Sequence, residues 1–95
     1  MASTGKRVRA VFAKMVNRDV RSIQDTDELN HYGFNKVNYF SLLENMEGNL
    51  GRYGLHFEIS DSDIELIANL KTVKDLVDFI GRISREHHKE VKNRG

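Results

Sequence analysis

Apolar residues recur at helical spacing in several segments of a chain that contains no proline. Proline breaks the interior of a helix, so its absence leaves each of these segments free to be helical. The first segment has the i, i+3, i+4, i+7, i+8 spacing of a helix with one buried face, in Val8, Val11, Phe12, Met15 and Val16. The pattern predicts an all-α fold whose first helix runs from about residue 6 to residue 17.

A long polar loop and a second helix are predicted next. The loop spans residues 17–30 and is anchored by three apolar residues, Val20, Ile23 and Leu29. Asn35 is a suitable N-cap for a helix that starts near it. The inward-facing residues of this helix are predicted to be Val37, Phe40, Leu43, Met46 and Leu50. Because neighbours on a helix point in different directions, this period leaves Tyr39 on or near the surface.

The second half of the chain predicts an extended connection and a short third helix. Apolar and polar residues alternate from Leu55 to Ile59, which is the period of a strand. No partner strand is evident, so we expect an extended connection that places its apolar side chains under the helices. Ser60 or Asp61 can cap the short helix that follows.

The last helix is predicted to open at Thr72, where Asp75 completes a pattern that resembles a capping box. Its apolar stripe consists of Val73, Leu76, Val77, Ile80 and Ile83. Residues 85–95 lose the stripe and are expected to form a frayed basic tail. The chain is therefore predicted to be a single domain over residues 1–95, with a core from about residue 6 to residue 84.

Charge and composition argue against several classes of function. Lys and Arg number 15 and Asp and Glu 14, so the net charge is +1, whereas a general nucleic-acid binder carries a clear basic excess. The charge is uneven, with +5 in residues 1–24, −7 in residues 25–65 and +3 in residues 66–95. The chain has no cysteine, which excludes disulfides, thiolate zinc sites and cysteine nucleophiles. No apolar run approaches the roughly 18 residues of a membrane span.

The N-terminal segment permits two interpretations. Residues 1–18 contain five basic residues and no acidic residue, a composition also found in mitochondrial transit peptides. We favour a structural helix, because removing this segment would strip one face from an already small core. The expected location is therefore cytoplasmic, with a mitochondrial location as the alternative.

Neither a metal site nor a catalytic site is predicted. The acidic clusters at residues 25–28 and 61–65 do not match a calcium-binding loop. His31 and His56 are isolated in the sequence, and His87 and His88 diverge as neighbours on a helix. No Ser-His-Asp arrangement or pair of catalytic carboxylates is evident, so we expect a protein that is not an enzyme.

The order of these elements resembles the acyl carrier protein family. The segment from Asp27 to Val37 is similar to the family's attachment region, a Gly followed after one residue by Asp-Ser-Leu at the start of helix two, and Leu29 stands where the family has an apolar anchor. Further similarity lies in Leu42, Leu43, Met46, Ile67 and residues 57–61 and 72–80. The resemblance covers roughly residues 8–83. It implies a four-helix bundle with three longer helices, a short third helix and a long first loop.

Lys36 occupies the position of the family's serine, which receives a 4′-phosphopantetheine arm. Asn35 retains the capping ability of Asp and Val37 the apolar character of Leu, but lysine has no hydroxyl that could form the phosphodiester. The nearest hydroxyls belong to Tyr39 and Ser41, and Ser41 is expected on a different face from position 36. We therefore expect no phosphopantetheine and no other cofactor. Lys36 either holds an acidic partner or an anion, or it drifted after carrier function was lost.

The resemblance, together with the altered motif, predicts a non-catalytic interaction module that acts through protein–protein contacts. The candidate contact residues are Lys36, Val37, Tyr39, Glu44 and Glu47. Tyr39 is either an exposed anchor for a partner or a partly buried side chain that covers the first loop. Carrier proteins dock through a strongly acidic second helix, whereas this one has only two acidic residues. We expect a monomer with a protein partner.

Two alternatives remain open at the level of sequence. The chain could be a divergent true carrier that shuttles acyl groups in fatty-acid or polyketide-type biosynthesis. It could also be a small helical nucleic-acid-binding or adaptor domain that uses its basic first helix, in which case binding should weaken steeply with salt.

Overall fold

The computed structural model describes residues 3–94, and the side chains of residues 3–88. Its α-helices are α1 (Thr4–Met15), α2 (Tyr39–Gly51), α3 (Ile64–Ala68) and α4 (Val73–Arg94). Short 3₁₀ turns lie at Val20–Ser22, Leu29–Tyr32 and Asp61–Asp63. The described residues form no strand, only an isolated antiparallel bridge between Glu28 and Thr72. The all-α prediction is confirmed.

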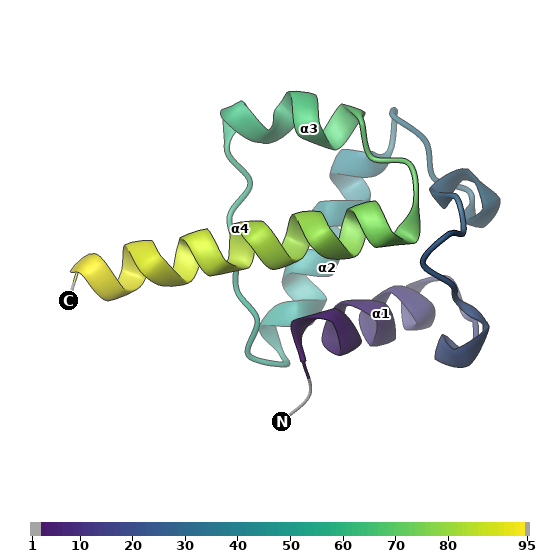
Figure 1. The fold of residues 1–95 in the computed structure, drawn as a ribbon, viewed down its shortest axis with the longest axis horizontal. Coiled ribbons are helices and arrows are strands. Elements are labelled where there is room, and N and C mark those ends of the chain that lie inside the picture. The colour runs from purple at the N-terminus through teal and green to yellow at the C-terminus, as the bar shows by residue number, and fades with distance from the viewer. Residues whose placement is uncertain (1–2, 95) are drawn as a thin grey trace.

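The helices enclose one apolar core. Figure 1 shows α4 running across α2, with α1 on one side of it and α3 on the other. Helix α1 packs against both α2 and α4, and α3 packs against α2. None of the helices within residues 3–94 combines the length and apolar character needed to cross a membrane.

Helix α1 contributes a full face to the core. Its buried residues are Val8, Val11, Phe12 and Ala13. The ring of Phe12 packs edge-to-face on Tyr32, with centroids 5.3 Å apart, and lies 5.9 Å from the ring of Phe34. The helix lies two residues earlier than predicted, because the side chain of Ser3 accepts a hydrogen bond from the Lys6 amide and caps its start. The N-terminal segment is therefore a core element.

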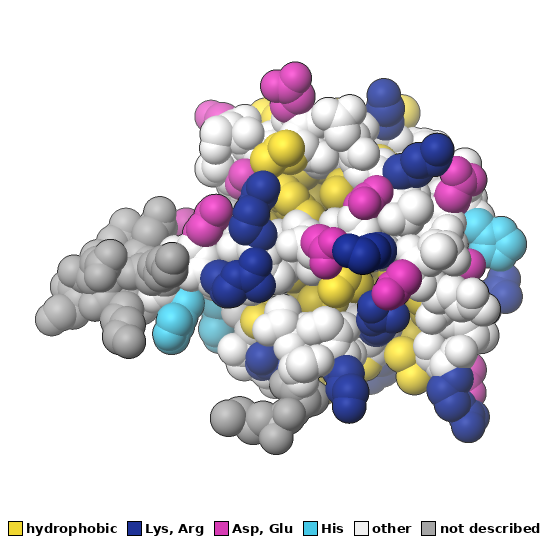
Figure 2. All heavy atoms as spheres, viewed as in Figure 1, with side chains coloured by type: hydrophobic (Ala, Val, Ile, Leu, Met, Phe, Trp, Pro, Cys, Tyr) yellow, Lys and Arg dark blue, Asp and Glu magenta, His cyan; other side chains and the backbone are white. Residues whose placement is uncertain are grey.

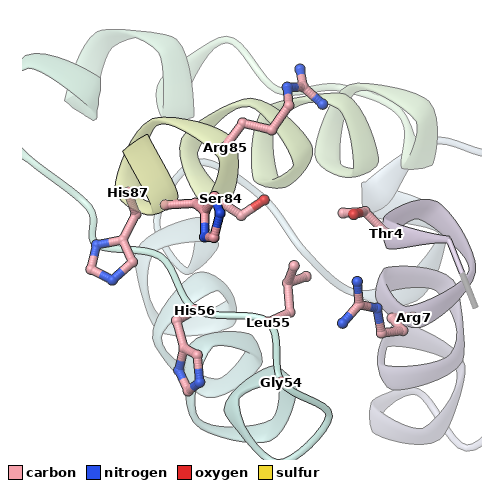
Figure 3. A pocket seen from close by; sticks show the side chains of 9 residues that line it. Thr4, Arg7, Gly54, Leu55, His56, Ser84, Arg85 and His87 are labelled. Carbon is pink, nitrogen blue, oxygen red and sulfur yellow. The ribbon is translucent and has the colours of Figure 1, made fainter. Parts of the chain in front are cut away.

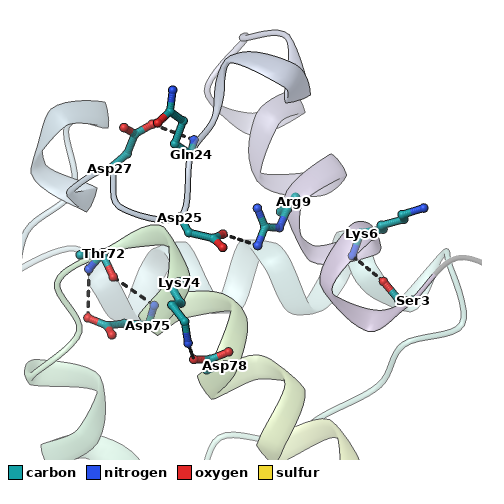
Figure 4. A network of polar contacts seen from close by, with 10 residues as sticks. All are labelled: Ser3, Lys6, Arg9, Gln24, Asp25, Asp27, Thr72, Lys74, Asp75 and Asp78. Carbon is teal, nitrogen blue, oxygen red and sulfur yellow. Dashed lines mark hydrogen bonds and ion pairs between the residues drawn. The ribbon is translucent and has the colours of Figure 1, made fainter.

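The start of α4 is a reciprocal capping box. The hydroxyl of Thr72 accepts a hydrogen bond from the Asp75 amide at 3.2 Å, and the Asp75 carboxylate accepts one from the Thr72 amide at 3.1 Å (Figure 4). The predicted capping box is confirmed. It satisfies backbone donors that a helix leaves unpaired in its first turn.

Backbone hydrogen bonds connect the long first loop to the start of α4. The amide of Val73 donates to the Asp27 carbonyl at 2.9 Å, and the amide of Lys74 donates to the Asp25 carbonyl at 3.0 Å. In return, the Leu29 amide donates to the Lys71 carbonyl at 2.8 Å. The predicted anchors Ile23 and Leu29 are buried, whereas the third, Val20, is exposed. Backbone hydrogen bonds thus hold the loop where apolar anchors are few.

Residues 52–54 form a turn after α2, and residues 55–60 form the predicted extended connection, with Leu55 and Phe57 buried. Ser60 ends it and precedes α3. Its amide and its hydroxyl both donate to the Asp63 carboxylate at 3.0 Å. The same carboxylate lies 4.0 Å from the guanidinium of Arg82, which links the start of α3 to α4.

The prediction of a frayed tail is wrong where the chain is described. Helix α4 continues to Arg94 and extends past the other helices in Figure 1. The stripe of core residues ends near Ile83, but the residues that follow are mostly good helix formers without glycine or proline before residue 95. Of this tail, Gly95 and the side chains of residues 89–94 lie outside the described part.

The outward face of α4 mixes both signs of charge. In Figure 2, acidic and basic side chains alternate over this face without a continuous basic patch. Lys74 pairs with Asp78 at 2.7 Å and Arg82 with Glu86 at 3.8 Å, each four residues apart on the helix. Such exposed pairs contribute little to stability, so this face of α4 is an ordinary solvated surface.

Candidate functional site

A capped turn precedes α2 and carries the residues predicted to replace the attachment motif. The Val37 amide donates to the side-chain oxygen of Asn35 at 2.9 Å, and the Asn35 amide donates to that of Asn38 at 2.8 Å. Asn35 is thus a cap, as predicted, but it caps this turn, and α2 itself begins only at Tyr39. Lys36 therefore lies before α2 and not in its first turn. Lys36 and Val37 both point into solvent, with Val37 92% exposed.

The predicted orientations of two neighbouring aromatic residues are reversed in the structure. Tyr39 is only 5% exposed, whereas Phe40 is 41% exposed. The buried residues of α2 are Tyr39, Leu42, Leu43, Met46 and Leu50. Their spacing fits a helix that starts at Tyr39, while the predicted period took its phase from Val37, which lies outside the helix. Val37 and Phe40 are therefore surface residues, and Tyr39 is a core residue.

Burial of Tyr39 decides between the two roles considered for it. Burial raises the pKa of its phenol, and the nearby carboxylates of Asp75 and Glu28 raise it further. The ring thus lies under the first loop and close to the start of α4, and its hydroxyl stays protonated at neutral pH. Tyr39 is a structural residue buried beneath the loop, and Phe40 takes its place as the exposed aromatic.

A groove runs between α2 and the extended connection. It is lined by Phe40, Glu44, Glu47, Glu58 and Ile59, which we call the α2 groove. Phe40, Glu44 and Glu47 lie three or four residues apart and so share one helix face. Glu58 and Ile59 were not predicted as site residues. The alternating pattern of residues 55–59 was the available signal, because it buries Phe57 and turns Glu58 outward.

The α2 groove combines apolar surface with three carboxylates. None of these carboxylates forms an ion pair with another described residue. Val37 and Lys36 are exposed in the turn that precedes α2. Lys36 is the one cation among the predicted contact residues. An aromatic side chain at the centre of a polar rim is a composition typical of protein–protein interfaces.

Carboxylates of the first loop have structural roles. Asp25 pairs with Arg9 (Figure 4), and Glu28 lies 3.6 Å from the ammonium of Lys71. Asp27 accepts a hydrogen bond from the Tyr32 hydroxyl and one from the Gln24 amide, and these lower the pKa of its carboxyl. Among the described residues, no three His, Asp or Glu side chains gather in a way that could hold a metal ion.

Ser41 is the third residue of α2 and is exposed, so it lies in the first helical turn. This exposed hydroxyl is the nearest serine to the position that Lys36 occupies in the motif.

The sequence matches no protein-family model, and no curated protein or solved structure is similar enough to count as a match. The function of the α2 groove therefore has to be inferred from its own residues and their chemistry.

Proposed function

We propose that this protein is an acyl-carrier-like interaction module that lacks the phosphopantetheine serine and acts through protein–protein contacts, without catalysis and without a cofactor. The order of three longer helices, one short third helix and a long first loop supports the resemblance. The observation that carries the proposal is the exposed ring of Phe40, which lines the α2 groove together with three carboxylates, with a further exposed apolar residue, Val37, in the turn before α2. A partner that covers an exposed valine and an exposed phenylalanine removes their apolar surface from water, which favours binding.

The chemistry of the groove defines the kind of partner. Glu44, Glu47 and Glu58 favour a surface that presents Lys or Arg side chains, and Phe40 favours an apolar side chain at its centre. Lys36 adds one positive charge at the edge and selects a partner with a carboxylate there. The partner is therefore a protein with a predominantly basic face around an apolar contact.

Affinity capture with matched variants tests the docking surface. We expect proteins retained from native extract by the wild-type chain to be lost with Phe40→Ser and with the double variant Glu44→Lys, Glu47→Lys. They should be retained by Arg21→Met, which changes an exposed residue that pairs with Asp19 far from the groove in sequence. The retained protein is then purified and titrated directly. Equal affinity for wild type and Phe40→Ser would contradict the proposed surface.

The missing prosthetic group has its own test. After incubation with coenzyme A and a broad-specificity phosphopantetheinyl transferase, the intact mass of the wild-type chain is expected to stay unchanged. Lys36→Ser restores the hydroxyl and is expected to gain the mass of one arm if the rest of the recognition surface is intact. A folded Lys36→Ser variant that gains no mass indicates that the acidic docking surface of carriers is also lost.

The exposed position of Ser41 supports one alternative, a true carrier that attaches its arm at a different serine. In that case the wild-type chain gains the mass of one arm, the modified peptide contains Ser41, and Ser41→Ala abolishes the gain. This result would overturn the proposed module, whereas an unchanged mass would exclude the carrier.

A further inference from the structure

A half-enclosed cavity lies where the first turns of α1, residues 54–56 and residues 84–88 of α4 meet (Figure 3). Its volume is about 570 Å³, which is within the usual range for small-molecule sites. The three segments are far apart in sequence, and none of them contributes to the α2 groove. The cavity is thus a separate feature, independent of the proposed docking function.

The cavity is lined by basic side chains. Arg7 comes from α1, His56 from the connection, and His87 and His88 from α4. In Figure 3, Arg7 projects toward the space between α1 and α4, whereas His87 lies on the side of the view away from Arg7. The described residues that line the cavity include no Asp or Glu. The field in this cavity therefore favours an anion.

Arg85 belongs to the same lining but is not counted among these donors. Its guanidinium lies beside Gly81 and points away from the space between α1 and α4 in Figure 3. The positive charge that faces the cavity therefore comes mainly from Arg7, and the histidines contribute ring nitrogens to its lining.

Arg7 is held in position at the cavity wall. One of its terminal nitrogens, Nη1, donates to the carbonyl oxygen of Tyr53 at 3.0 Å. Its Nε is buried and has no acceptor among the described residues. Because this Nε is buried, an acceptor oxygen in the cavity would have to meet the terminal N–H groups of the guanidinium that the hydrogen bond to Tyr53 does not use.

We propose that the cavity binds the phosphate monoester group of a small organic molecule, with Arg7 as the principal charged donor. A phosphate monoester presents three terminal oxygens, which suits donors that arrive from three segments. The hydroxyl of Thr4 points toward the cavity and adds a neutral donor (Figure 3). Leu55 supplies an apolar surface for the organic group, and the cavity is large enough to hold both parts.

Titration of the isotope-labelled full chain with phenyl phosphate, at constant ionic strength, tests this site. We expect saturable shifts of the amide signals of residues 4–7, 54–56 and 84–88. Sulfate, which has the charge but no organic group, should bind more weakly. The absence of saturable shifts, or sulfate binding as tightly as phenyl phosphate, would overturn the proposal.

Matched variants locate the charged donor. Arg7→Met keeps the length of the side chain and is expected to weaken phenyl phosphate binding by about tenfold or more, because it removes charged hydrogen bonds. Arg21→Met makes the same chemical change outside the cavity and should bind as wild type does. His56→Gln changes an exposed residue and gives an independent measurement if Arg7→Met does not fold. Wild-type affinity in both Arg7→Met and His56→Gln would exclude this cavity as the binding site.

Vesicles distinguish two sources of the same phosphate group. We compare co-sedimentation with phosphatidylcholine vesicles that contain or lack phosphatidic acid. Binding to phosphatidic acid alone, lost in Arg7→Met, assigns the ester to a lipid headgroup. Binding of phenyl phosphate without co-sedimentation assigns it to a soluble molecule.

Discussion

The α2 groove collects three carboxylates around Phe40, whereas the cavity beside α4 is lined by Arg7 and three histidines and, among the described residues, by no carboxylate. Both regions lie on the same small core. The net charge of +1 hides this contrast, because it averages a segment of −7 with two positive segments. Folding brings the first and last parts of the chain together with residues 54–56 at the cavity, while the groove is lined by the middle part alone. Two regions of opposite charge select different kinds of ligand.

The largest expected effect is on the core that supports both regions. Tyr39→Ala removes a buried ring beneath the first loop and is expected to lower the free energy of unfolding by about 3–5 kcal/mol. Phe40→Ala removes an exposed ring and should cost much less. Urea denaturation followed by circular dichroism measures both. Equal losses for the two variants would contradict the assignment of Tyr39 to the core and Phe40 to the groove.

The next effect separates the two regions from each other. Phe40→Ser is expected to weaken binding of the protein partner by at least about tenfold, as loss of a central aromatic contact does, and to leave phenyl phosphate binding unchanged. Arg7→Met should show the opposite pattern. Both affinities are measured for both variants by calorimetric titration. A variant that weakens both kinds of binding would show that the groove and the cavity are parts of one site.

A smaller effect is expected at the start of α4, which belongs to neither region. Thr72→Ala removes the side-chain oxygen that caps the helix and is expected to lower stability by about 1 kcal/mol. Thr72→Ser keeps the hydroxyl and serves as the control. Both binding activities should remain at wild-type levels, and thermal unfolding gives the change in stability. A loss of phosphate binding in Thr72→Ala would mean that the cavity depends on the far end of α4.

The smallest effect concerns acid stability in the first loop. Hydrogen bonds from the Tyr32 hydroxyl and the Gln24 amide hold the pKa of Asp27 below its ordinary value of 3.8. The folded state thus favours the ionised carboxylate. The stabilisation is fully present above pH 3.8 and is lost as the pH falls through the lowered pKa of the folded state. Asp27→Asn should therefore show a shallower loss of melting temperature in acid than wild type, and identical slopes would contradict this role.

Local signals made much of the fold predictable. Thr72 and Asp75 form the predicted capping box because both partners lie within one helical turn. The alternation of residues 55–59 likewise gave the extended connection, since a period of two is a property of the backbone alone. The start of α2 could not be predicted in the same way. Asn35 caps an extra turn, and that turn shifted the phase assigned to Tyr39 and Phe40.

The candidate sites depended on tertiary contacts that no local pattern contains. Of the predicted contacts, Lys36, Val37, Glu44 and Glu47 are exposed in or before α2, while Tyr39 is buried. The cavity could not be predicted because its histidines belong to separate segments. His56 is isolated in the sequence and His87 diverges from its neighbour on α4, yet folding brings both to the cavity that Arg7 also lines. The lack of acidic residues in the first eighteen positions was the only signal available.

The amides of Val73 and Lys74 donate hydrogen bonds to two carbonyls of the first loop, those of Asp27 and Asp25. These contacts have a consequence for the order of folding. A helix start normally recruits its partners from neighbouring residues, but α4 depends on acceptors from the opposite half of the chain. Closing so long a segment costs chain entropy before any contact compensates for it, which slows folding. A peptide of α4 alone lacks these acceptors. Docking of the loop and completion of the last helix are therefore expected to occur as a single kinetic event.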